Sequence, residues 1–198
     1  MKTIHEFLNN HSDEKPKSNQ RGEFSDWLDF YELDVRGDAL QFTETRVLGI
    51  RGNENAECHE IPVVPGKYSV ECMGVSFGGD RRVAALRAYP KGKAVTVGEK
   101  VSEIPVDLGG VSVVDIAAII QSINENEERY EEWAEEILFG SDDYSLVSLH
   151  EWLETKTKIP SVESGFGDGV YDLFELRSDG GVVGLQIVFI REDDLYFA

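Results

Sequence analysis

A stretch late in the sequence, Gly165 to Ile190, restricts the possible folds of this chain more than any other. It opens with a compressed Gly-Phe-Gly-Asp-Gly loop and continues as two apolar, β-rich runs joined by Ser-Asp-Gly-Gly. Two such runs around a glycine-rich turn are typical of a β-hairpin. We therefore expect a hairpin near residues 170–190 and, with it, an antiparallel sheet.

A second hairpin is expected near residues 68–89. Tyr68, Val70 and Cys72 alternate with more polar residues, a glycine-rich turn follows, and a second apolar run returns. This period of two is the signature of a strand with one buried face. β-branched and aromatic residues predict further strands at 30–35, 40–50 and 59–63, and one short strand at 94–97 or 101–106.

The pattern changes after residue 110. From Ser112, apolar residues recur at spacings of three and four, which predicts a helix. A glutamate-rich helix that ends at Gly140 and a third helix that ends before Pro160 are expected to follow. The predicted fold class is therefore α+β, with an antiparallel β-sheet packed against helices inserted at about 112–156.

The sequence predicts one folded domain with a polar extension. Residues 1–25 are expected to form a polar N-terminal arm, and residues 26–198 a single α+β domain. Within the arm, Thr3 and Glu6 have the spacing of a capping box, which predicts a short helix over residues 3–10.

The charge of the chain bears on its partners. It carries 38 acidic and 19 basic residues, for a formal net charge of −19 at pH 7. Nucleic-acid binding needs a basic surface, so this balance argues against a nucleic-acid partner. Two explanations stay open: an acidic surface that favours solubility, or a basic protein partner attracted by the charge. The sequence does not indicate an oligomeric state.

Location and cofactors are expected to be simple. No apolar run approaches the roughly 20 residues that span a membrane, and the first residues lack the apolar core of a secretory signal. We expect a cytoplasmic protein without membrane association. Cys58 and Cys72 lack zinc-site spacing, and the glycine-rich loop lacks the lysine of a phosphate-binding loop, so no cofactor is predicted.

Several short motifs together resemble a bacterial family known only as a conserved domain of unknown function. Its PGxYPV, GDxRVAA, VDAG and GDGxYPVY motifs correspond to stretches that begin at Pro65, Gly79, Val106 and Gly167. Ser69 and Asp172 stand where the family usually has proline. The resemblance implies an α+β domain, and some members occur in gene neighbourhoods suggestive of toxin immunity.

Three aspartates in the glycine-rich turns are candidate ligand or metal residues: Asp80, Asp107 and Asp168. If their turns met, the carboxylates could hold a hard cation such as calcium. The competing explanation is structural, because an aspartate beside glycine often bonds its own turn. On that explanation, Asp168→Ala costs about 1 kcal/mol or more of folding stability.

The predicted glutamate-rich helix offers a possible docking face, formed by Glu128, Glu131, Glu132 and Glu135. With the acidic charge and the absence of a recognisable catalytic set, this face favours a protein-binding or immunity-type module over an enzyme. The alternative function is a small metal-dependent hydrolase that uses the three turn aspartates.

Overall fold

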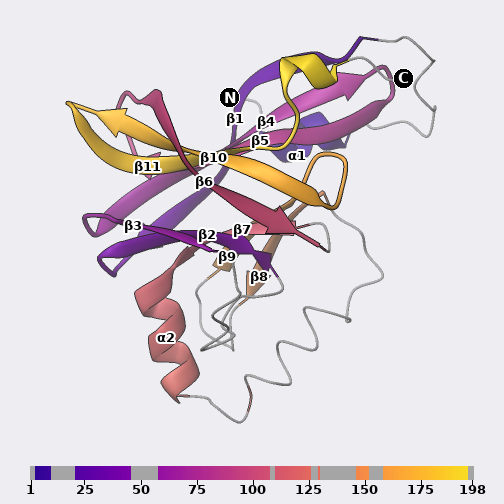
Figure 1. The fold of residues 1–198 in the computed structure, drawn as a ribbon. Coiled ribbons are helices and arrows are strands. Elements are labelled where there is room, and N and C mark those ends of the chain that lie inside the picture. Colours follow the sequence, from indigo (N-terminus) through magenta and orange to yellow (C-terminus); the bar gives the residue numbers. More distant parts are fainter. Residues whose placement is uncertain are drawn as a thin grey trace.

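The computed structural model of the chain consists of two antiparallel β-sheets packed face to face (Figure 1). It describes residues 3–9, 21–45, 58–107, 110–125, 129, 146–151 and 158–195. The six-stranded sheet has the order β1-β4-β5-β11-β10-β6, and the five-stranded sheet has the order β3-β2-β7-β9-β8.

The six-stranded sheet contains β1 (Glu23–Val35), β4 (Gly66–Phe77), β5 (Asp80–Pro90), β6 (Thr96–Val106), β10 (Gly169–Ser178) and β11 (Gly181–Val188). The five-stranded sheet contains β2 (Ala39–Glu44), β3 (His59–Pro62), β7 (Gly110–Asp115), β8 (Val147–Glu151) and β9 (Lys158–Glu163). The helical elements are α1 (Ile4–Leu8), α2 (Ile116–Glu125) and the 3-10 turn η2 (Glu192–Asp194).

Both predicted hairpins are confirmed. β4 pairs with β5 and β10 pairs with β11, each antiparallel. Tyr68, Val70 and Cys72 are buried, as their alternation predicts. In the turn between β10 and β11, Asp179 and Gly180 have φ values of 51° and 82°. These left-handed conformations match the twist of a two-residue hairpin and favour glycine and aspartate.

The main core lies between the two sheets. Residues with no exposed surface come from both layers, including Phe42 and Val113 of the five-stranded sheet and Leu86 and Ile187 of the six-stranded one. Each buried side chain of this size contributes about 1.5–3 kcal/mol of apolar burial. The interface between the sheets therefore dominates the stability of the fold.

The N-terminal helix belongs to this core. α1 begins after Thr3, whose side chain accepts a hydrogen bond from the Glu6 backbone N–H while Glu6 bonds back, so the predicted capping box is confirmed. Ile4 is 0% exposed, and Leu8 is also buried. The described residues of the predicted polar arm are thus part of the folded domain, and β1 begins within the arm at Glu23.

The predicted α+β class with helices at about 112–156 is wrong. The region starts with strand β7, continues with the short helix α2, and includes strand β8 where the third helix was expected. The protein is nearly all β in the described residues. Residues 126–128 and 130–145, which hold the rest of the predicted glutamate-rich helix, lie outside them.

The error has a physical cause at β7. Val111 and Val113 are buried on one face of the strand, and Ser112 and Val114 are buried on the other. A strand that is buried on both faces has no polar alternation, so its apolar run cannot be told from a helix by periodicity. The helix starts after Asp115, whose carboxylate accepts a hydrogen bond from the Ala117 N–H at 3.2 Å.

The same carboxylate also binds the segment of chain that passes from one sheet to the other. Asp115 Oδ2 accepts hydrogen bonds from the backbone N–H groups of Arg36, at 2.6 Å, and Gly37, at 3.1 Å. The segment 36–38 leads the chain from β1 in one sheet to β2 in the other. None of the helices in the described ranges is long and apolar enough to cross a membrane.

Candidate functional site

The three glycine-rich turns meet at one end of the six-stranded sheet. Phe77 at the end of β4 pairs with Asp80 at the start of β5, on either side of the first turn. Gly169 at the start of β10 pairs with Val106 at the end of β6. Because neighbouring strands run antiparallel, these termini all fall at the same end of the sheet. We call this region the turn end; it comprises residues 77–82, 106–107, 163–170 and 189–195.

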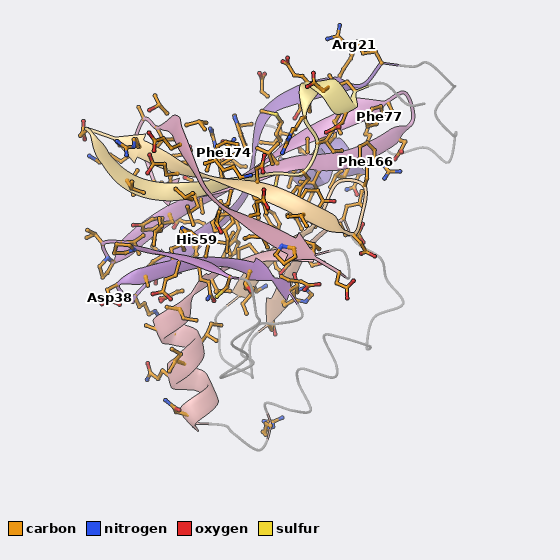
Figure 2. The ribbon with its side chains drawn as sticks, viewed as in Figure 1. Arg21, Asp38, His59, Phe77, Phe166 and Phe174 are labelled. Atoms are coloured by element: carbon orange, nitrogen blue, oxygen red, sulfur yellow. The ribbon has the colours of Figure 1, made fainter. Side chains whose placement is uncertain are left out.

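Figure 2 shows two labelled aromatic residues of the turn end beside each other, Phe77 and Phe166. Their ring centroids are 5.9 Å apart. Asp38 lies at the opposite end of the molecule in the same view. The loop around Phe166 therefore lies beside the β4–β5 turn on one surface, although the two are far apart in the sequence.

Arg82 connects the β4–β5 turn to the glycine-rich loop. Its Nε and Nη2 atoms each lie 2.9 Å from Asp80 Oδ2, and its Nη1 donates a hydrogen bond to the Gly165 carbonyl at 3.3 Å. Its guanidinium lies 5.1 Å from the centroid of the Phe166 ring, a cation–π contact. The charge of Asp80 is thus neutralised within the fold.

The glycine-rich loop is fixed by hydrogen bonds that converge on one carbonyl. The Ser164 and Tyr171 hydroxyls both donate to the Gly167 oxygen at 2.6 Å, and the Gly167 N–H donates back to the Ser164 carbonyl. Gly165 and Gly167 have φ values of +42° and +106°, which non-glycine residues rarely adopt. A Cβ atom at Gly165 would also lie 2.8 Å from Ile190.

The turn aspartates do not form a metal site in the described part of the chain. Asp80 is bound to Arg82, whereas Asp107 and Asp168 are exposed. Among the residues with described positions, no group of three or more His, Cys, Asp or Glu side chains could hold a metal ion. The sequence left open whether the turns converge; they do, and Arg82 lies between Asp80 and the glycine-rich loop.

Asp168 also lacks the structural role that the sequence suggested. Its carboxylate makes no hydrogen bond to the described residues; the bonds that hold the loop come from Ser164 and Tyr171. Burial raises the pKa of the Tyr171 phenol, and the negative charges of Asp168 and Asp194 raise that pKa further, although a hydrogen bond to Ser164 opposes them. Both carboxylates therefore act on the same hydroxyl.

Unpaired carboxylates gather at the turn end. Of the described residues there, five exposed acids make no ion pair within the described chain: Asp107, Asp168, Glu192, Asp193 and Asp194. Elsewhere on the six-stranded sheet, several acids are matched by bases, although Glu23, Asp26, Asp29 and Glu99 make no ion pair with the described residues either. The pairs are Glu32 with Lys67 and Lys91, Asp34 with Arg36 and Lys67, Glu71 with Arg87, Asp172 with Lys100 and Arg191, and Glu175 with Arg177.

Apolar groups are exposed beside these acids. Phe166 retains 45% of its surface and Val170 retains 60%. A signal for the exposure of Phe166 was present in the sequence, because Phe166 stands inside a glycine-rich loop and loops lie at the surface. The acids of η2 could not be assigned to this end, because their position depends on the path of the chain after β11.

A second polar cluster lies on the outer face of the six-stranded sheet. Arg87 donates through Nε to Glu71 at 2.8 Å, Tyr89 donates to the other Glu71 oxygen at 2.8 Å, and the Arg87 guanidinium lies 3.9 Å from the Trp27 ring centroid. Burial raises the pKa of Tyr89, as does its bond to Glu71. The charges cancel within this cluster, so we assign it to the stability of the sheet.

The predicted docking face at Glu128, Glu131, Glu132 and Glu135 lies outside the described residues. Comparisons of the chain with models of protein families, with curated proteins and with solved structures find no match. The assignment of function therefore depends on the geometry and charge of the turn end.

Proposed function

We propose that this chain is a protein-binding module of the immunity type, whose partner is a basic protein. The observation that carries the proposal is the gathering of exposed carboxylates beside exposed apolar side chains at the turn end. The acids there, such as Asp168 and Asp193, make no ion pair with the described residues, and Phe166 and Val170 lie among them with 45% and 60% of their surface exposed.

Exposed carboxylates without ion pairs favour binding to a positively charged protein surface. A field from several unpaired carboxylates attracts a basic partner and speeds its association. The net charge of −19 for the whole chain acts in the same direction. The motif resemblance to a bacterial family also supports an immunity role, because some of its members occur in gene neighbourhoods suggestive of toxin immunity and immunity proteins act by binding.

The alternative, a small metal-dependent hydrolase, receives less support. It requires Asp80, Asp107 and Asp168 to share a cation, yet the Asp80 carboxylate already contacts the Arg82 guanidinium at 2.9 Å. A guanidinium at this position would repel a metal ion.

Affinity capture with charge variants tests the proposal. The reversal variant carries Asp168→Lys and Asp193→Lys at the turn end. The matched control carries Asp38→Lys and Glu60→Lys, two exposed acids near β2 and β3, and changes the net charge equally. We expect wild type and control to retain a basic protein that the reversal variant does not retain.

The identity of the retained protein decides the result. Mass spectrometry should find a protein with a basic isoelectric point, and the complex should dissociate as the salt concentration rises, since salt screens exposed charges. Capture of an acidic protein, or equal capture by the reversal variant, would argue against the proposal.

A further inference from the structure

We infer that Phe166 is the apolar anchor of this docking surface, and that Arg82 and Asp80 hold it in position for a basic partner with an apolar recess. This inference rests on the proposed function, which supplies the partner. It adds the residue at the centre of the contact and the second chemical property of the partner's surface.

The exposure of Phe166 indicates that its ring can contact a partner. An aromatic ring that keeps 45% of its surface exposed leaves a large apolar area in water. Val170 adds an apolar side chain that is 60% exposed, four residues along the chain. Binding energy in protein interfaces is concentrated in a few aromatic anchors surrounded by polar residues that exclude water. Asp107 directly follows Val106 at the end of β6, and Asp168 directly precedes Gly169 at the start of β10. These two strand ends pair with each other, and the two exposed aspartates supply such a rim.

The rigidity of the loop carries the second step. The hydroxyl groups of Ser164 and Tyr171 each donate a hydrogen bond of 2.6 Å to the carbonyl oxygen of Gly167. Gly167 is the residue directly after Phe166. The ring itself is bounded by Phe77, at 5.9 Å, and by the Arg82 guanidinium, at 5.1 Å. An anchor that is already held in its bound position loses less conformational entropy on association.

Arg82 is a positioning residue in this arrangement. Asp80 holds two of its nitrogen atoms at 2.9 Å, and a third nitrogen bonds the Gly165 carbonyl. The ion pair between Asp80 and Arg82, both on β5, thus holds the guanidinium in its position beside the Phe166 ring. Because Arg82 is neutralised by Asp80, it does not oppose the approach of a basic partner.

The chemistry of the surface defines the partner. The acids at the rim require lysine or arginine on the partner, and the Phe166 side chain requires an apolar recess between them. We therefore expect a basic protein whose contact surface has apolar residues at its centre. An arginine-rich surface without such a recess would bind through charge alone, without dependence on Phe166.

Photo-crosslinking tests this inference in cells that produce the whole chain. A photoreactive phenylalanine analogue, benzoylphenylalanine, replaces Phe166 in one variant and Val182 in the control; Val182 is 40% exposed on β11. We expect a covalent adduct with one basic protein from position 166 and none from position 182. Adding Asp168→Lys and Asp193→Lys should remove the adduct.

Binding of the crosslinked protein, purified, then measures the anchor. Phe166→Ala should weaken its Kd by about tenfold or more, as expected for an interface hot spot, whereas Val182→Ala should leave it unchanged. Asp80→Asn should weaken binding less than Phe166→Ala. An unchanged Tm in Phe166→Ala would show that the loss does not come from unfolding.

The experiments distinguish a wrong assignment of Phe166 as the anchor from a wrong assignment of the partner as a basic protein. No adduct at position 166, or an unchanged Kd in Phe166→Ala, would overturn the anchor even if charge reversal still abolished capture. An adduct at position 166 that survives charge reversal would support the anchor and contradict the proposed basic partner.

Discussion

At the scale of single residues, the turn end shows why local motifs point to a site without revealing its chemistry. The sequence correctly indicated that Asp80, Asp107 and Asp168 lie in glycine-rich turns, and these turns meet. It could not show that Arg82 would connect Asp80 to the glycine-rich loop, because the orientation of that side chain depends on the pairing of β5 with its neighbours. The guanidinium neutralises the Asp80 carboxylate, so the three aspartates do not share a metal site in the described chain.

The first residue-scale prediction concerns the glycine-rich loop. Tyr171→Phe should lower the free energy of unfolding by about 1 kcal/mol, because one of the two donors to the Gly167 carbonyl is lost. Asp168→Ala, in contrast to the value expected from sequence, should change it by less than about 0.5 kcal/mol. Urea denaturation measures both. A larger loss in Asp168→Ala than in Tyr171→Phe would show that the aspartate does hold the loop.

The second residue-scale prediction concerns Asp115. Asp115 is 3% exposed, and its carboxylate accepts hydrogen bonds from the backbone N–H groups of Arg36, Gly37 and Ala117. Asp115→Ala should cost about 3 kcal/mol, because three part-buried hydrogen bonds are lost together. Asp115→Asn, which keeps one oxygen, should cost less. Equal stability of Asp115→Ala and wild type in urea would refute this role.

At the scale of elements, strands joined by a clear turn signal could be predicted and the others could not. β4 alternates clearly, and a glycine-rich turn marks each hairpin, so both hairpins are right. β7 is buried on both faces and lacks such a turn, and near β8 the spacing of Leu146 and Leu149 is typical of a helix. The period of the sequence could not separate these possibilities, and the burial that decides between them comes from the second sheet.

The prediction for α1 follows from its position in the core. Ile4→Ala should lower the free energy of unfolding by about 2–4 kcal/mol, since Ile4 is fully buried and its removal leaves a cavity. Asn9→Ala, at the exposed end of the same helix, is the control and should cost less than about 0.5 kcal/mol. A small loss for Ile4→Ala would mean that residues 3–9 form an independent arm, as the sequence suggested.

The prediction for β8 concerns pH. Burial lowers the pKa of His150 below its ordinary value of 6.5. The unfolded chain therefore takes up a proton on this ring at a higher pH than the folded chain does. The stability that His150 provides is complete above pH 6.5 and is lost as the pH falls from there through the folded-state pKa.

Replacement of the ring isolates this effect. Between about pH 7 and about pH 5, His150→Gln should lose less stability than wild type, as measured by urea denaturation at each pH. His5→Gln, at an exposed position in α1, serves as the control and should follow the wild-type curve. Identical slopes for wild type and His150→Gln would contradict the assigned burial.

At the scale of the whole molecule, a β-sandwich presents one end of its larger sheet as an acidic surface with an aromatic centre. The net charge was evident from composition, but its uneven distribution was not. Some acids on the strands are paired with a base across the sheet, as Glu71 is with Arg87, and such pairs follow from strand register. At the turn end, Asp107, Asp168 and the acids of η2 make no ion pair with the described residues.

The dependence of partner binding on salt and on charge position tests whether the turn end binds a basic protein. The Kd of the captured basic protein would be measured by calorimetry from about 50 mM to about 500 mM NaCl, for wild type, the Asp168→Lys/Asp193→Lys variant and the Asp38→Lys/Glu60→Lys control. We predict that Kd rises steeply with salt for wild type and control, and that the turn-end variant binds at least about tenfold more weakly at low salt. A Kd that depends on neither salt nor the turn-end charges would contradict the account.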